Sequence, residues 1–480
     1  MQVSRLWRTL TLSTPRLWAG VHIVGMPSHR KSGIRRWSDG LEYCDSAPRL
    51  QSALTRAGAV PLDVYISDFN YSHQENTEDD RTRKAFLEEC CKMGVDNWRS
   101  LEILLDGASV DGLLHGRFAS LEELLICGFQ SSVLLHLLVD APRLKTIALF
   151  YVPLRPWAVL PFWSKIRSFS LVRITSFDND EFDAFTTILE SSQSLESLQI
   201  KRKDICRSQW APLDSRRPIV LPHLRMLTYR GDWAIPIVAP NLIQLTIKNI
   251  RLPELLQTKH LDGASFIEMP HLIQLSLTCT TLSDLAILRA LRLKDLTLRK
   301  MMEPNTDEGL ASVWTHETGE KSGNGSGLFP ALSILRLENF TASFTVLRSA
   351  LECLSPQLQE LHFKNCSLPW TFSHVFCGGS PRRPSFSTSA SSAQTSASPS
   401  PPPLSPPRQG RYLCPSLERI SIVVHSMARG DKDVIRRALL DLVHIRKIAG
   451  LNLDSLMVDW DWSERWEELV HHELSNSFMP

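Results

Sequence analysis

The residues that could carry out catalysis or hold a metal ion are few and poorly spaced for either task. The sequence has no Walker-type phosphate loop, nucleophile elbow, kinase signature or H-E-x-x-H zinc motif. His471, His472 and Glu473 stand in the reverse order of that zinc motif, without a third ligand nearby. The glycine-rich run 323–327 lacks the preceding strand and following helix of a dinucleotide loop. We therefore predict a protein without catalytic residues, cofactor or metal; an enzyme with an unrecognised site is the less favoured hypothesis.

Composition and charge exclude several classes of partner. The 480 residues are 43% hydrophobic, and 53 Lys and Arg against 51 Asp and Glu leave a net charge of +2. This rules out a chain-wide basic surface that grips nucleic acid by phosphate neutralisation alone. No uninterrupted apolar run approaches the roughly 18 to 20 residues that cross a bilayer. The ten cysteines include no C-x-x-C pair, which favours reduced, packed thiols in the cytoplasm or nucleus.

One pattern recurs along most of the chain, and the fold that it forms must position any binding site. It is an apolar residue, two variable residues, an apolar residue, one variable residue and another apolar residue. A looser copy begins at Leu101. The twelve good copies begin at Leu121, Leu144, Ile166, Leu195, Leu224, Leu242, Leu272, Leu293, Leu332, Leu358, Leu417 and Leu453.

The repeat predicts one short strand per copy. The last two apolar residues are two positions apart, so they point to the same face of a strand, and stacked copies bury that face together. The spacing matches a leucine-rich repeat. We expect an α/β leucine-rich-repeat solenoid with parallel strands on its concave face and irregular helices and loops on its convex face. Helical connections are predicted over 81–93, 181–190 and 433–449. An antiparallel β-sandwich is the alternative.

The repeats predict a solenoid over 98–460 with two insertions. Residues 380–407 contain 20 Ser, Pro and Thr among 28 residues, too little apolar surface to order a segment, so we predict a disordered insert over 378–410. A flexible loop is expected over 303–328, which ends in KSGNGSG. Residues 461–480 are expected to cap the last repeat.

The N-terminal 24 residues predict two short helices and a strand. Trp7 and Leu10 belong to the first helix, and Leu17 and Trp18 follow a Ser-Thr-Pro start signal for the second. The run VSRLWRTLTLSTPRLWAGVHI and the later RLQSALTRAGAVPLDVYIS resemble fungal F-box-like proteins, in which such a box and a joining helix and strand precede leucine-rich repeats. The resemblance implies an F-box remnant over 1–24 and a linker over 25–97.

That resemblance implies a substrate-recognition subunit of an SCF-type ubiquitin ligase, with a Skp-type adaptor as a partner if the box is completed upstream. The family's opening L-P-x-E helix is not in this sequence, so the alternative is a leucine-rich-repeat scaffold without a ligase role. Residues 1–38 also hold seven Lys and Arg and no Asp or Glu. That composition fits a mitochondrial transit peptide as well, which keeps a mitochondrial location as a minor alternative.

Strand residues facing the concave side are the candidate binding site. The residue after the last apolar position is often basic, and neighbouring strands lie about 4.8 Å apart. We expect a basic row that engages an acidic or phosphorylated protein partner. The alternative is that these cations only solubilise exposed strand positions. The residues at this position are Lys201, Arg230, Lys248, Thr278, Arg299, Glu338 and Lys364, and all of them except Glu338 are the candidate binding residues.

Overall fold

The computed structural model consists of two compact units, residues 1–258 and 259–480, and each is described by itself. The structure describes residues 10, 13–24, 42–44, 47–67, 85, 89, 95–104, 117–128, 141–172, 179–201, 217–231, 236–250, 252–256, 267–278, 285, 287–299, 329–339, 351, 357–366, 414–424, 439–440, 442–444, 446–447, 451 and 453–460.

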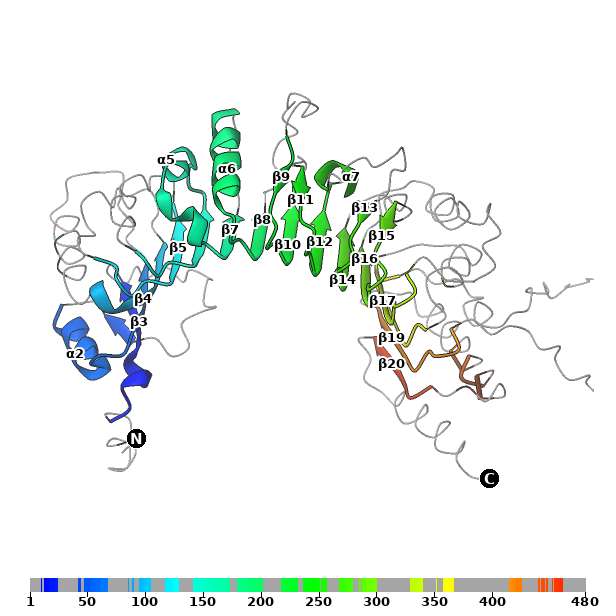
Figure 1. The fold of residues 1–480 in the computed structure, drawn as a ribbon. Helices are drawn as coiled ribbons and strands as arrows, with labels where there is room; N and C mark the ends of the chain where they lie inside the picture. The colour runs from blue at the N-terminus through cyan, green and yellow to red at the C-terminus, as the bar shows by residue number, and fades with distance from the viewer. Residues whose placement is uncertain are drawn as a thin grey trace, which may run out of the picture. The chain divides into compact units, whose positions relative to one another are not determined.

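The first unit is built on a parallel sheet whose strand order is β2-β1-β3-β4-β5-β6-β7-β8-β10-β12. Figure 1 shows the strands of this unit side by side, from blue to green. Every pairing recorded between them is parallel. The strands are β1 (Gly20–Val24), β2 (Glu42–Cys44), β3 (Leu62–Ser67), β4 (Trp98–Leu104), β5 (Glu123–Cys127), β6 (Thr146–Phe150), β7 (Ser168–Val172), β8 (Ser197–Lys201), β10 (Met226–Arg230) and β12 (Gln244–Lys248).

The second unit repeats the same construction with the order β14-β16-β17-β18-β19-β20. Its recorded strand pairs are parallel as well. Its strands are β14 (Gln274–Thr278), β16 (Asp295–Arg299), β17 (Ile334–Glu338), β18 (Glu360–Lys364), β19 (Arg419–Val424) and β20 (Ser455–Trp460).

Each of the twelve good copies of the repeat forms one of these strands, which begins two residues after the first apolar residue. The second and fourth strand residues are buried in most strands, as Leu198 and Ile200 are in β8. The first apolar residue is buried too in eleven of the twelve copies, as Leu195 is before β8, and half-buried at Leu453. The prediction of one strand per repeat is confirmed, because only stacked neighbours can cover these side chains.

The weak copy was placed three residues too late. In β4 the buried residues are Trp98, Leu101 and Ile103, and the register pairs Leu101 with Leu124 and Ile103 with Ile126. The repeat therefore begins at Trp98, an aromatic residue that a leucine-based pattern overlooks. The sheet also extends upstream of residue 98, because β1 and β3 pair with each other and β3 pairs with β4.

Helices connect some of the strands. The helix predicted over 181–190 is α6 (Asn179–Ser191), which lies next to β7 and β8 in Figure 1. Its buried Phe185 contacts Phe169 of β7, with ring centroids 6.2 Å apart. Of the helix expected over 81–93 the structure describes helical residues 85 and 89, and of the helix expected over 433–449 it describes helical residues 439–440, 442–444 and 446–447. The other helices are η1 (Pro15–Trp18), α2 (Ala47–Ala57), η2 (Val95–Asn97), α5 (Arg155–Ala158), η3 (Pro161–Lys165) and α7 (Leu252–Leu255).

Two small parallel sheets of two short strands each form from chain segments that connect the main strands. In the first unit β9 (Ile219–Val220) pairs with β11 (Ile237–Val238), and in the second β13 (Ile267–Glu268) pairs with β15 (Leu288–Arg289). Each precedes a main strand by a few residues, so the entering chain segments also stack.

Several strands end in a left-handed turn. Asn249, Asn339 and Asn365 follow β12, β17 and β18 with φ of 65°, 51° and 53°. Asparagine tolerates this conformation better than most residues. The backbone N–H of Asn339 donates to the Lys364 carbonyl at 2.7 Å, so the turn extends the ladder by one hydrogen bond.

The fold is α/β, with long parallel sheets and few helices, as expected for a solenoid-like repeat protein. Parallel pairing throughout the described strands excludes the antiparallel β-sandwich. No helix among the described residues has the length and apolar character needed to cross a bilayer. The insert predicted over 378–410, the loop over 303–328 and the cap over 461–480 all lie outside the described residues.

Candidate binding face

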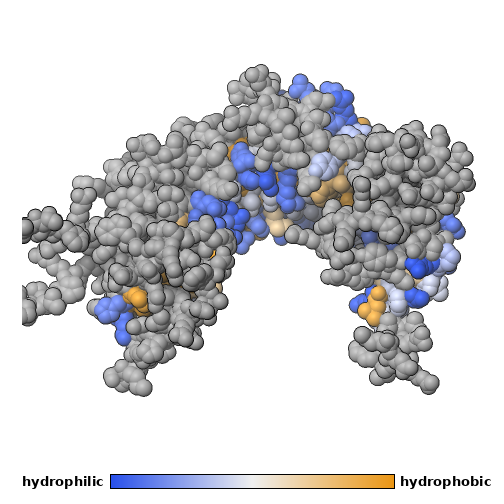
Figure 2. Space-filling model, turned by 180° about the vertical axis from the view of Figure 1, so that it is seen from behind, coloured by the Kyte–Doolittle hydropathy of each residue, from blue (hydrophilic) through white to orange (hydrophobic). Residues whose placement is uncertain are grey.

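From β5 to β20, the first, third and fifth residues of each main strand form the face of the sheet that the core does not cover, here called the open face; the register adds Ser100, Glu102 and Leu104 of β4 to it. These positions are half-buried in most strands, whereas the second and fourth are buried. Side chains alternate along a strand, so each of these positions forms a row across neighbouring strands. In Figure 2 the described surface is mostly hydrophilic, with hydrophobic residues visible as small patches.

Three predicted site residues lie together in the first unit. The register pairs Lys201 of β8 with Arg230 of β10, and Arg230 with Lys248 of β12. Parallel strands about 4.8 Å apart place the three cations within about 10 Å. We call Lys201, Arg230 and Lys248 the basic row. The other open-face residues of these strands include no Asp or Glu: Ser197, Gln199, Met226, Thr228, Gln244 and Thr246.

Neutral hydrogen-bonding groups lie beside the basic row. The Ser170 hydroxyl donates to Gln199 Oε1 at 3.0 Å. That bond identifies Oε1 as the acceptor for Ser170, and the other end of the Gln199 amide carries two donor hydrogens on Nε2. Thr228 and Thr246 occupy the same row on the next two strands. Cations, an amide N–H₂ and hydroxyl groups can together bind carboxylate or phosphate oxygens.

The open face changes character on the strands preceding β8. Half-buried hydrophobic residues occupy the third and fifth positions of β5 and β6 and the fifth position of β7, and the register brings them side by side. We call this group the apolar half. It consists of Leu125 and Cys127 of β5, Ala148 and Phe150 of β6, and Val172 of β7.

A desolvated carboxyl group borders the apolar half. Glu102 of β4 lies in register with Leu125, and burial raises the pKa of Glu102 above its ordinary value because the charged form loses water. Nearby, Arg99 binds Asp63 through Nη2–Oδ2 and Nε–Oδ1 contacts of 2.5 and 3.0 Å. The Asp63 carboxylate raises the pKa of the Arg99 guanidinium.

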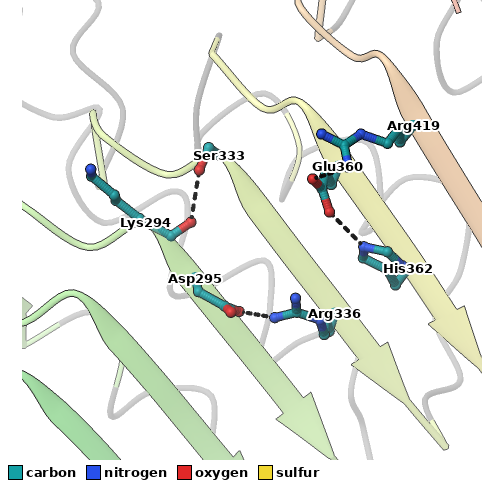
Figure 3. A network of polar contacts seen from close by, with 7 residues as sticks. All are labelled: Lys294, Asp295, Ser333, Arg336, Glu360, His362 and Arg419. Atoms are coloured by element: carbon teal, nitrogen blue, oxygen red, sulfur yellow. Dashed lines mark hydrogen bonds and ion pairs between the residues drawn. The ribbon is translucent and has the colours of Figure 1, made fainter. Parts of the chain in front are cut away.

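The open face of the second unit carries cations and carboxylates that pair with each other (Figure 3). Arg336 of β17 binds Asp295 of β16. Glu360 of β18 contacts Arg419 at 3.0 Å and His362 at 3.1 Å. We call Asp295, Arg336, Glu360, His362 and Arg419 the charge-paired network.

The other three predicted site residues lie in this second unit. Thr278, Arg299, Glu338 and Lys364 follow one another in register. Arg299 Nε contacts Glu338 Oε2 at 2.9 Å. A carboxylate therefore lies within the expected row and forms an ion pair with one of its cations. Lys364 is exposed, and Thr278 is half-buried and uncharged. The row in this unit is therefore mixed in charge.

Of the residues assigned to the F-box remnant, Trp7 lies outside the described residues. Leu10 and Leu17 are 48% and 58% exposed. Trp18 is half-buried, and the Arg56 guanidinium of α2 lies 4.5 Å from its ring centroid. That distance fits a cation–π contact, which ties η1 to α2.

One cation of the second unit is buried. Arg446 is 2% exposed and donates to the carbonyl oxygens of Cys414, Pro415 and Leu417 at 3.2, 3.4 and 2.6 Å. Burial lowers the pKa of Arg446 and raises that of the Cys414 thiol to about 12. Arg446 thus holds the chain segment that enters β19.

Sequence reasoning missed the carboxylates and cations at the first and third strand positions. Asp295, Arg336 and Glu360 were visible as charged residues two or four positions before the predicted row. Only the register shows which of them meet. Among the described residues, no three His, Cys, Asp or Glu side chains are grouped closely enough to bind a metal ion.

Comparison with known proteins gives the chain no family. No family model matches it, and no curated protein matches it. A solved structure of a protein from Bacteroides fragilis aligns with 66% of this chain and 71% of its own, at 10% identity and a TM-score of 0.19.

Proposed function

We propose that this protein is a non-catalytic, leucine-rich-repeat binding module that takes an acidic or phosphorylated segment of a partner protein on the open face of its first unit. The observation that carries the proposal is the basic row. Its three cations are aligned by strand register, with no carboxylate at an open-face position of the same three strands. Such a patch attracts anions over a Debye length of about 8 Å at physiological salt.

The test measures binding of a fluorescein-labelled decapeptide rich in Asp and Glu, and of a serine-phosphorylated peptide of equal charge. The variant combines Lys201→Glu, Arg230→Glu and Lys248→Glu. We expect it to lose at least about tenfold in affinity for both peptides, because attraction becomes repulsion. Higher salt should also weaken binding to the native protein.

Two control variants test whether a loss of peptide affinity comes from the basic row itself or from the change in net charge. Lys165→Glu changes an exposed lysine of η3 outside the open face, and Arg299→Glu changes the predicted row in the second unit. Both should leave peptide affinity within about twofold, and the triple variant and Lys165→Glu should keep the unfolding temperature. Equal peptide binding by the triple variant and the native protein would refute the proposal.

We propose further that the module serves an SCF-type ubiquitin ligase as its substrate-recognition subunit. The N-terminal resemblance supports this role, as do exposed Leu10 and Leu17, which leave apolar surface for an adaptor. Co-purification with a Skp-type adaptor tests it, with Leu10→Ser and Leu17→Ser as weakening variants. If the adaptor fails to bind the native protein, the alternative of a scaffold outside any ubiquitin ligase takes its place.

A further inference from the structure

The basic row and the apolar half belong to one continuous surface. The strand order β5-β6-β7-β8-β10-β12 places the apolar half directly before the basic row. Register pairs carry one row of fifth positions from Cys127 through Phe150 and Val172 to Lys201 without a break. The surface therefore changes from apolar to cationic in a fixed direction across the strands.

From this juxtaposition we infer that the partner segment is itself divided, with hydrophobic side chains at one end and acidic side chains at the other. The inference rests on the proposed function and names the kind of segment that the open face takes. Hydrophobic residues of the partner lie over the apolar half, and its carboxylates or phosphates reach Lys201, Arg230 and Lys248.

The dimensions suit a short extended segment. Five strand steps from β5 to β12 cover about 24 Å, at about 4.8 Å per step. An extended chain advances about 3.3 Å per residue, so about seven residues reach from one end to the other. Half of these residues point toward the sheet, which leaves room for two hydrophobic contacts and two anionic contacts.

Neighbouring groups favour one placement over its reverse. Glu102 stands beside Leu125 at the far end of the apolar half, and a second carboxylate there would meet like charge in a poorly hydrated setting. An acidic end placed across β8, β10 and β12 meets three cations instead. Hydrophobic side chains have the opposite preference, because the apolar half removes them from water.

Three designs of labelled decapeptide, the first of them made in two block orders, test the inference by fluorescence anisotropy. The first has a Leu/Phe block followed by an Asp/Glu block, and is also made in reverse order. The second has the same composition with the residues alternating. The third keeps the acidic block and replaces the hydrophobic block by Ser and Gly. We expect one of the two block orders to bind about tenfold more tightly than the alternating and serine peptides.

Protein variants test whether the apolar half causes the gain in affinity of the block peptide. Leu125→Ser with Phe150→Ser should remove the tenfold advantage of the block peptide and leave the serine peptide unaffected. Met457→Ser, which changes a 54% exposed open-face residue of the second unit, is the matched control and should change nothing. The peptide comparison needs no variant, so it stands even if the double variant unfolds.

The outcomes distinguish this inference from the proposed function. If all acidic peptides bind with equal affinity and the triple reversal of the basic row abolishes binding, the divided segment is refuted and the proposed function stands. If no acidic peptide binds, the proposed function fails first, and this inference fails with it.

Discussion

The open faces of the two units are made by the same repeat, yet they handle charge differently. On β8, β10 and β12 of the first unit, three cations share the face with no carboxylate. On β16 to β19 of the second unit, the acidic residues Asp295, Glu338 and Glu360 share the face with Arg299, Arg336, Lys364 and Arg419, and four contacts join these residues to each other or to His362. The same position in the repeat therefore presents a row of cations in one unit and a surface of mixed charge in the other.

The difference teaches that a cation becomes available to a ligand only through what its neighbouring strands carry. An anion approaching Arg299 or Arg336 must displace Glu338 or Asp295, which are already held in place. At the basic row, an approaching anion meets no Asp or Glu at an open-face position of β8, β10 or β12. The following experiments test this comparison by replacing side chains that contribute to different degrees to the stability of the folded protein.

The largest effect on stability is expected at Arg446, the cation most fully used by the fold. Arg446→Met removes a charged donor from three carbonyl oxygens in a buried site. We expect a loss of about 2–4 kcal/mol in the free energy of unfolding, because buried acceptors lose their partner. Urea denaturation measures this change.

Arg292→Met is the matched control for Arg446, because Arg292 is exposed in the same unit. It should change the free energy of unfolding by less than about 0.5 kcal/mol. If the two variants cost the same, the carbonyl contacts of Arg446 contribute nothing and its burial is incidental.

An intermediate effect is expected in the charge-paired network. Arg336→Asp places two carboxylates together in a partly buried setting, with the Arg336 and Asp295 side chains 34% and 18% exposed. We expect a loss of about 1–2 kcal/mol, and recovery of most of it when Asp295→Arg is added. A thermal-unfolding double-mutant cycle gives the coupling energy.

The first unit supplies the counterpart to that cycle. Lys201→Glu should cost less than about 0.5 kcal/mol, because no carboxylate lies at an open-face position of β8, β10 or β12 to repel it. A cost as large as that of Arg336→Asp would show that the basic row serves folding, and the contrast between the two faces would disappear.

The smallest effect is expected at Glu102. Its pKa is raised in the folded chain, so folding penalises the ionised form, and the penalty grows as pH rises above the ordinary value of 4.5. Glu102→Gln removes the charge and should raise the unfolding temperature slightly at pH 7. The gain should shrink at pH 5, because the native carboxyl is then partly protonated. Glu123→Gln, exposed on β5, should show no such pH-dependent gain.

Much of the fold could be predicted from hydrophobic spacing alone. The twelve leucine-rich copies predicted their strands, and the period of Phe182, Phe185, Ile188 and Leu189 predicted α6, because burial imposes the same spacing wherever a strand or helix packs on a core. The copy at β4 was misplaced because Trp98 fills the first position. The upstream strands β1 and β3 were assigned to the remnant and linker because they carry only the alternation of a strand.

The candidate site was less predictable. Lys201, Arg230 and Lys248 could be found by their place after the last apolar residue, and the register aligns them. The pairing of Arg299 with Glu338 could not be predicted from position in the repeat. Whether two charges meet depends on which strands are neighbours and on side-chain direction, and neither is a local property of the sequence.

The sequence by itself determined that the chain folds as repeated short strands, because the apolar residues recur at a spacing that only a buried strand face explains. Tertiary structure decided which polar residues remain available on the opposite face. Strand order and register bring Asp295 to Arg336 and Glu360 to Arg419, and they leave Lys201, Arg230 and Lys248 together beside an apolar surface. Charges separated by tens of residues interact only after the backbone ladder has placed them within a few ångströms.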